Sequence, residues 1–95
     1  MNRHSIDIQK VETEWKSRGF HGGVWIDPPG QVWEDYVHDV DELVMLVEGD
    51  VEVELLGSTH RLRPGEELFI PAHTAHTVRN VGLGRSRWLY AYRRE

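Results

Sequence analysis

From residue 20 onward, the hydrophobic positions recur in short runs that are typical of β-strands. Residues 51–55 read Val-Glu-Val-Glu-Leu, so their three apolar side chains face inward and the two glutamates face water. Trp88, Tyr90 and Tyr92 likewise share one face of a final strand. Residues 43–47 are apolar at every position, which predicts a strand covered by the opposite sheet on one face and by a partner or the amino-terminal segment on the other.

Turn signals separate these runs and lie at residues 27–30, 49–50, 57–58, 64–65 and 82–84. They delimit about eight strand segments with no helix between them, which predicts an all-β fold, either a double-sheet sandwich or a small barrel.

One helix is predicted before the strands, at residues 11–19. Val11 and Trp15 lie four apart there, acidic residues come early, basic residues come late, and Gly19 ends the segment. We therefore divide the chain into an amino-terminal segment, residues 1–19, whose short helix packs on the β-domain, and the β-domain itself, residues 20–95.

Length and composition narrow the possible functions. The 95 residues fit a single domain, and the absence of cysteine excludes disulfides, thiolate metal ligands and a cysteine nucleophile. The longest aliphatic run, residues 43–47, is far too short to span a membrane, and residues 1–10 contain no apolar signal core. We therefore expect a soluble, unprocessed protein without a membrane partner, and a reducing cytoplasm fits the lack of cysteine.

Charge is unevenly distributed along the chain. The net charge of −5 combines −9 over residues 1–60, from 13 acidic and 4 basic residues, with +4 over residues 61–95, from 7 arginines and 3 acidic residues. An acidic chain disfavours binding to a phosphate backbone, so no nucleic-acid partner is expected. The late arginines could form a local anion site, but a solvated surface is the simpler interpretation.

Six histidines are the unusual feature of the composition, and three of them fall in two blocks of polar residues and turn residues. The first block is Gly30-x5-Tyr36-x-His38-x3-Glu42-x6-Gly49, and the second is Gly65-x5-Pro71-x-His73-x2-His76-x3-Asn80.

These blocks resemble the two motifs of the cupin superfamily, G-x5-H-x-H-x3,4-E-x6-G and G-x5-P-x-G-x2-H-x3-N. The resemblance extends over roughly residues 25–92 and implies a double-stranded β-helix, the jelly-roll barrel of cupins, with a short N-terminal helix. Only 15 residues separate Gly49 from Gly65, so the chain resembles a minimal single-domain cupin.

The resemblance also implies a metal site. By position, His38, Glu42 and His76 match three of the four family ligands, and Tyr36 stands where the family has its first histidine. Two imidazoles and one carboxylate suit a divalent ion such as Fe, Mn, Ni, Co or Zn, with coordination positions left open. Tyr36 could complete the shell as a phenolate, hydrogen-bond a metal-bound water or simply fill space, and a metal-free pocket is the alternative.

A second departure from the family motif is His73, which replaces the usual glycine of the turn. Histidine tolerates positive φ better than most residues, and its side chain either reaches the barrel mouth or lies exposed. We predict Tyr36 and His73 as candidate catalytic residues that move a proton. Asp39 and Asp41 flank His38 as turn residues or, alternatively, as hydrogen-bond partners of an imidazole.

The remaining histidines and the aromatic residues are interpreted structurally. His4, His21 and His60 are expected at the surface or at strand edges. The large aromatic side chains are expected in the core or at a subunit contact rather than around a ligand; they are Trp25, Trp33, Trp88, Tyr90 and Tyr92.

Two functions remain open at this stage. The first is a metal-binding cupin that holds a small organic molecule in the barrel and acts as an oxygenase or isomerase, with the metal polarising a substrate oxygen. The second is a non-catalytic binding or sensor module, with or without metal. A homodimer is expected, because residues 43–47 and the aromatic final strand would otherwise leave apolar surface exposed.

Overall fold

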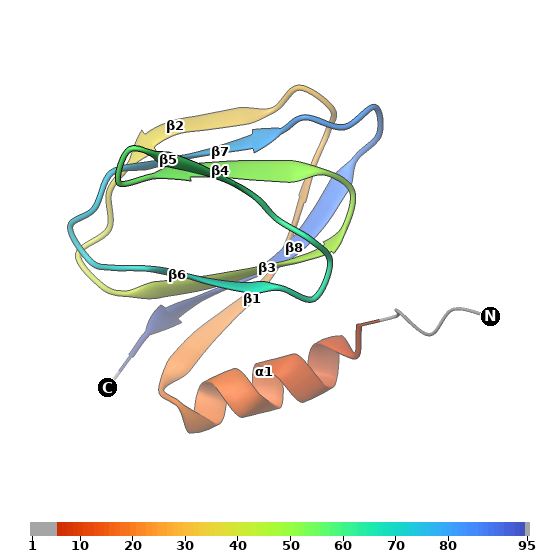
Figure 1. Ribbon diagram of the computed structural model, residues 1–95. Coiled ribbons are helices and arrows are strands. Elements are labelled where there is room, and N and C mark those ends of the chain that lie inside the picture. The colour runs from red at the N-terminus through yellow and green to blue at the C-terminus, as the bar shows by residue number, and fades with distance from the viewer. Residues whose placement is uncertain (1–5, 95) are drawn as a thin grey trace.

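The computed structural model describes residues 6–94, apart from the side chain of residue 35, and these residues form one helix and two four-stranded antiparallel sheets that face each other (Figure 1). The elements, in chain order, are α1 Ile8–Ser17, β1 Phe20–Asp27, β2 Val32–Tyr36, β3 Glu42–Glu48, β4 Val51–Leu55, β5 Ser58–Arg61, β6 Glu67–Ile70, β7 His76–Asn80 and β8 Ser86–Arg93. The predicted all-β jelly roll with a short N-terminal helix is confirmed. His4 lies outside the described residues.

The chain crosses repeatedly between the two sheets. One sheet has the strand order β1-β8-β3-β6 and the other has β2-β7-β4-β5, so neighbouring strands are often distant in sequence. The crossings bring the start of β3 in one sheet opposite the start of β7 in the other, which is where the two sequence blocks meet (Figure 1).

Strand β3 is buried on both faces, as its sequence predicts. Val44 and Leu46 belong to the core cluster between the sheets, together with the inward side chains of β4. Leu43 and Met45 point to the other side, into a second cluster built around Trp15 of α1. The amino-terminal segment therefore covers the outer face of β3, which was one of the two alternatives for that face.

Helix α1 begins three residues earlier than the sequence pattern predicts. The Asp7 side chain accepts a hydrogen bond from the backbone N–H of Lys10 at 3.1 Å, which caps the helix before Ile8. Gly19 follows the helix with φ +90°, as expected of a glycine that ends a helix in the left-handed region. Glu67 on β6 anchors the far end, because its carboxylate accepts from the Trp15 indole at 3.0 Å and from the Arg18 guanidinium at 3.1 and 2.7 Å.

Residues 6–94 contain no helix with the length and apolar character needed to cross a bilayer. Neither surface on which the expected homodimer was based is left exposed, because α1 covers the outer face of β3 and the aromatic side chains of β8 turn toward the space between the sheets. The homodimer stays a prediction.

Candidate metal centre and cavity

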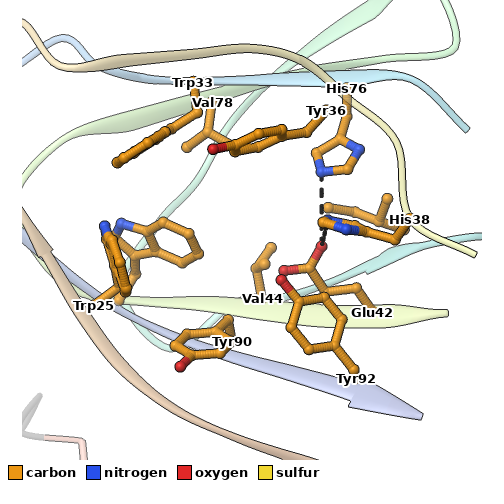
Figure 2. A pocket seen from close by; sticks show the side chains of 12 residues that line it. Trp25, Trp33, Tyr36, His38, Glu42, Val44, His76, Val78, Tyr90 and Tyr92 are labelled. Atoms are coloured by element: carbon orange, nitrogen blue, oxygen red, sulfur yellow. Dashed lines mark ion pairs between the residues drawn. The ribbon is translucent and has the colours of Figure 1, made fainter. Parts of the chain in front are cut away.

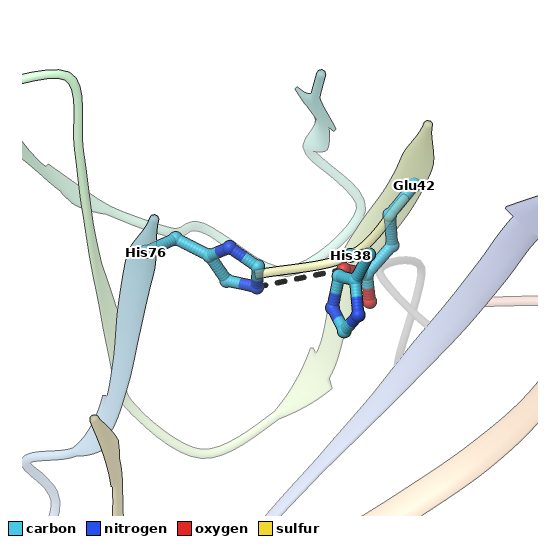
Figure 3. A group of neighbouring side chains, drawn as sticks. All are labelled: His38, Glu42 and His76. Atoms are coloured by element: carbon cyan, nitrogen blue, oxygen red, sulfur yellow. Dashed lines mark ion pairs between the residues drawn. The ribbon is translucent and has the colours of Figure 1, made fainter. Parts of the chain in front are cut away.

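His38, Glu42 and His76 meet at one end of the space between the sheets (Figures 2 and 3). His38 lies in the connection after β2, Glu42 is the first residue of β3, and His76 is the first residue of β7. One ligand atom from each lies within 4.8 Å of the other two. The sequence blocks thus place three metal-ligating side chains together although they come from both sheets.

The Glu42 carboxylate is the centre of this group. Its Oε1 atom lies 3.1 Å from Nε2 of His38 and 3.6 Å from Nε2 of His76. Glu42 and His76 are each 3% exposed, so solvent does not compensate the carboxylate. Burial raises the pKa of Glu42 to about 7, far above the usual value for a glutamate.

The contact between His76 and Thr74 leaves Nε2 of His76 facing the site. Its Nδ1 atom lies 3.1 Å from the backbone carbonyl oxygen of Thr74. Since a carbonyl only accepts, Nδ1 is the donor in this contact, and the tautomer with its proton on Nδ1 has the lone pair of Nε2 directed toward Glu42. This is the tautomer that a metal-binding histidine needs.

The surroundings of His38 favour its neutral form. Burial lowers its pKa, the nearby His76 lowers it further, and Asp39 acts in the opposite direction. The rings of His38 and His76 lie 4.9 Å apart between centroids, and Tyr92 packs against His38 at the same centroid distance. Two imidazoles therefore face one carboxylate.

These residues fit a divalent metal ion. Glu42 Oε1 is buried and accepts no hydrogen bond from any residue among 6–94, so a buried oxygen is left for another partner. A cation would compensate that oxygen, and two imidazoles with one carboxylate are ligands that Zn, Fe, Mn, Co and Ni accept.

Two connections fix the backbone around the candidate ligands. Asp41, next to Glu42, accepts from the Ala72 backbone N–H at 2.8 Å and from Nε of Arg93 at 3.2 Å. The hydrogen bond from Ala72 is the main reason why the pKa of the Asp41 carboxyl is lowered, and the interaction with Arg93 lowers this pKa further. Of the two roles expected for Asp41, the structure shows the turn role, because its carboxylate ties together the loops that carry the site.

His73 contributes through its backbone. Its φ is +62°, as its position in the family's glycine turn requires, and its N–H donates to the carbonyl oxygen of His38 at 2.6 Å. The His73 side chain is exposed and borders a surface depression outside the central cavity. The structure therefore joins His73 to the site as a backbone donor, and a catalytic role of its imidazole stays a prediction.

The metal candidates form one end of an aromatic cavity of about 430 Å³. Its walls are lined by Trp25, Trp33, Tyr36, Val44, Ile70, Val78, Trp88, Tyr90 and Tyr92 (Figure 2). The expectation that the aromatic residues pack in the core is confirmed for Trp33, Trp88 and Tyr90, which contact the core cluster, but all five of them also line the cavity. Strand alternation predicts that they share a face but does not show that this face borders an open space.

Tyr36 lies in this wall. Its ring stacks on Trp33, with centroids 5.7 Å apart and an interplanar angle of 17°, and its centroid lies 6.5 Å from that of His76. Figure 2 shows its hydroxyl directed along the cavity and away from His76. Of the three roles considered for Tyr36, this placement favours filling space, here as a flat wall, and its catalytic role stays a prediction.

Sequence reasoning missed Tyr92 as a neighbour of the metal candidates. Tyr92 is paired with Glu42 across the β3–β8 ladder. Burial and the negative charge of Glu42 raise the pKa of Tyr92 to about 12, so the phenol stays protonated and can donate. Only the strand register shows that Tyr92 and Glu42 are neighbours, and the spacing of residues within either block does not predict this register.

Sequence reasoning also missed Asp27, the last residue of β1. Asp27 is 2% exposed, and its carboxylate accepts from the indole N–H of Trp25 at 2.8 Å, of Trp33 at 3.1 Å and of Trp88 at 3.1 Å. Asp27 is the first residue of the Asp-Pro-Pro-Gly turn signal. Because aspartate is common in turns, the sequence gives no reason to expect the contacts of Asp27 with the tryptophans.

The fold and the group of two histidines and one glutamate resemble those of cupins, and a comparison with protein families tests the resemblance. The cupin domain family model matches residues 23–92, and the chain belongs to this family.

Two known proteins are similar in sequence to most of this chain. Polyketide synthase CurC of Streptomyces cyaneus is 38% identical over 72 residues, which are 76% of this chain and 47% of that protein. Protein SchB of Streptomyces halstedii is 32% identical over 78 residues, 82% of this chain and 56% of that protein. The chain thus spans about half the length of these curated relatives.

Among solved structures, the fold resembles the cupin domain of an XRE family transcriptional regulator from Enterobacter cloacae. The TM-score is 0.73 at 20% identity, with 84% of this chain and 86% of that chain covered. At this identity the similarity concerns the fold alone.

Proposed function

We propose that this protein is a metal-binding cupin that holds a flat, oxygen-bearing organic molecule of polyketide type and isomerises or oxygenates it. One observation carries the proposal: three metal-ligating atoms within 4.8 Å of one another stand at the end of a 430 Å³ cavity lined by aromatic side chains. The cavity has the size range and the mostly apolar lining of a small-molecule site.

The two ends of the cavity suit two parts of one ligand. His38, Glu42 and His76 hold the metal, which when bound supplies Lewis-acid polarisation of a ligand oxygen. The stacked pair Trp33 and Tyr36 forms a flat wall against which a ring packs face to face or edge to face.

The polyketide class comes from the relatives. CurC is named a polyketide synthase. Polyketides are chains or fused rings that carry carbonyl and hydroxyl oxygens on a carbon framework, so they combine the oxygen ligands and the flat apolar surface that this cavity would bind.

Protein groups near the metal end act on the bound molecule. Tyr92, with its pKa of about 12, holds a proton beside Glu42 and donates a hydrogen bond to a developing negative charge. The aromatic walls exclude water and so strengthen these polar interactions. The carbonyl oxygen of Thr74 holds the imidazole of His76 in place. The carboxylate of Asp41 holds the backbone next to Glu42 in place.

Titration with Co(II), followed by absorption, tests the metal site first. The wild type is expected to bind one ion, His76→Ala is expected to lose it, and the exposed His60→Ala is expected to bind as the wild type does. Equal Co(II) binding by wild type and His76→Ala would contradict the site.

Turnover is then tested with 1-tetralone, a two-ring aromatic ketone. Isomerase chemistry requires exchange of the hydrogens next to the carbonyl in D₂O, measured by NMR, and oxygenase chemistry requires uptake of dioxygen. Binding of 1-tetralone with neither reaction would favour the non-catalytic binding or sensor module. A metal-free pocket would bind it equally well with and without Co(II).

A further inference from the structure

The carboxylate of Asp27 gathers three tryptophans from three strands. Trp25 lies on β1, Trp33 on β2 and Trp88 on β8, and all three indole N–H groups donate to this one side chain. Oδ1 accepts from Trp25 and Trp33, and Oδ2 accepts from Trp33 and Trp88. Both sheets are therefore linked through a single carboxylate.

This arrangement is unusual for a buried charge. Asp27 is 2% exposed, and no Lys, Arg or His side chain within residues 6–94 forms an ion pair with it. A buried carboxylate without a cation is costly, and apolar side chains of similar volume often give a fold of equal stability. Stability alone does not explain why a carboxylate stands here.

Trp25 points to a role in shaping the cavity. Its side chain is 43% exposed, so its indole N–H could bond to water and needs no protein partner. The 2.8 Å bond to Asp27 nevertheless fixes the ring, which meets Trp33 edge to face at a centroid distance of 5.9 Å and Tyr90 at 6.2 Å. Without this bond, a half-exposed ring would be free to rotate.

All three tryptophans line the cavity, whereas Asp27 does not. In Figure 2, Trp25 and Trp33 stand at the end of the cavity away from the metal candidates His38, Glu42 and His76. The orientation of these indoles sets the shape of that end, and Asp27 sets their orientation from behind.

We propose that Asp27 is a positioning residue for ligand binding, because its hydrogen bonds to three indoles fix the tryptophan end of the cavity in a shape that accepts a flat ring system. This inference rests on the proposed function, in which the ring of the ligand lies at that end while its oxygens lie at the metal. Asp27 then governs affinity for the ring and leaves affinity for the metal unchanged.

Two probes separate the ends of the cavity. 2-Acetyl-1-naphthol carries a hydroxyl beside a carbonyl on a flat two-ring framework, and acetylacetone offers a comparable oxygen pair without a ring. Dissociation constants for both are measured by calorimetry on the Co(II)-loaded protein, for the wild type and for Asp27→Asn. The variant keeps the volume of the side chain but replaces one accepting oxygen by an NH₂ donor that faces indole N–H groups.

Asp27→Asn is expected to weaken binding of 2-acetyl-1-naphthol at least tenfold, while the affinities for acetylacetone and Co(II) change less than twofold. Asp50→Asn is the matched control, since Asp50 also loses hydrogen bonds, to Arg61, at a surface position away from the cavity. It is expected to leave all three affinities unchanged.

NMR of the indole N–H groups reports the positioning directly. In Asp27→Asn the resonances of Trp25, Trp33 and Trp88 are expected to shift and exchange faster with solvent, while that of Trp15, bound to Glu67, stays in place. If Asp27→Asn does not fold, Trp25→Phe takes its place, since it keeps an aromatic ring and removes one of the three N–H donors. Trp25→Phe is expected to lower the affinity for 2-acetyl-1-naphthol about threefold and to leave the affinity for acetylacetone unchanged.

Several results would overturn the inference. They are an unchanged naphthol affinity in a folded Asp27→Asn, an equal loss for both probes, and failure of the wild type to bind the naphthol. Failure of the proposed function has a different signature, since the wild type would then bind neither Co(II) nor acetylacetone.

Discussion

Glu42 and His76 belong to different sheets, yet Oε1 of Glu42 and Nε2 of His76 lie 3.6 Å apart. A metal ion shared by these two side chains would bridge the sheets of the sandwich. Metal binding is then coupled to folding, because the complete site exists only when the sheets are packed together.

The first prediction follows from this coupling. Metal at 100 times its dissociation constant is expected to stabilise the protein by about 2.7 kcal/mol, which raises the Tm of a domain of this size by roughly 10 to 20 °C. His76→Ala is expected to abolish the shift, and the exposed His60→Ala is expected to retain it. Thermal unfolding with Zn(II) and with EDTA measures both, and a full metal shift in His76→Ala would contradict the coupling.

The second prediction concerns Glu42 without metal. Since its pKa rises from about 4.5 in the unfolded chain to about 7 in the fold, the folded state favours the protonated carboxyl. The contribution of Glu42 to stability is therefore full below pH 4.5 and is lost as the pH rises to about 7, a change of up to about 3 kcal/mol.

Glu42→Gln removes this titration. In EDTA at pH 8 the variant is expected to unfold at higher urea concentration than the wild type, and the difference is expected to shrink toward pH 5. The same variant is expected to lose its metal response. A difference in unfolding free energy that does not change between pH 5 and 8 would show that Glu42 is not desolvated in the fold.

The third prediction concerns the anchor of α1. Glu67→Gln weakens the bonds from Trp15 and Arg18 and is expected to lower the free energy of unfolding by about 1 to 2 kcal/mol at pH 7. The bonds from Arg18 and Trp15 lower the pKa of Glu67, so its contribution is present above the pKa of the unfolded chain and is lost as the pH falls through the lower folded value. Urea unfolding at pH 7 and pH 3 tests this, with the exposed Glu14→Gln as control.

The fold and the metal candidates could be predicted because they follow from local patterns. The alternation in residues 51–55 places three apolar side chains in the core, and the resemblance of the two blocks to the cupin motifs marks His38, Glu42 and His76 as metal candidates. The first signal depends on the strand period, and the second on the match to the motifs of a known family.

The rest of the site depends on contacts between distant residues. The sequence around Asp27 predicts a turn residue. Nothing next to Asp27 in the sequence shows that Trp88, 61 positions later, donates a hydrogen bond to its carboxylate. Tyr92 becomes a neighbour of Glu42 only through the register of β3 and β8. The cavity itself is a space that the inward aromatic side chains leave open, and strand alternation specifies direction but not the volume that remains.

The fourth prediction is the oligomeric state. Strand β1 is an edge strand whose neighbour in the sheet is β8, and it carries Val24, Trp25 and Ile26 with exposed fractions of 40%, 43% and 51%. Such an edge can pair with the same strand of a second copy. Sedimentation at micromolar concentration is expected to show twice the chain mass of 11.1 kDa, and Ile26→Lys is expected to shift the protein to the monomer. A single 11.1 kDa species for the wild type would reject the dimer.

The fifth prediction uses Tyr36, one of the two residues that depart from the family motif. Tyr36 is paired with His76 across the β2–β7 ladder, and its ring centroid lies 6.1 Å from that of His38. Tyr36→His would add a third imidazole beside two existing ones, which matches the ligand set that the motif spacing implies. Tyr36→Phe removes only a hydroxyl that points away from His76 (Figure 2).

Tyr36→His is therefore expected to tighten Zn(II) binding about tenfold, an effect of about 1.4 kcal/mol, and Tyr36→Phe is expected to change it less than twofold. Competition with a chelator of known affinity measures both constants at pH 7.5, which lies above the reference pKa of an imidazole. A loss of affinity in Tyr36→Phe equal to that in His38→Ala would instead make the Tyr36 oxygen a metal ligand, because removing the hydroxyl would then remove a donor atom from the site.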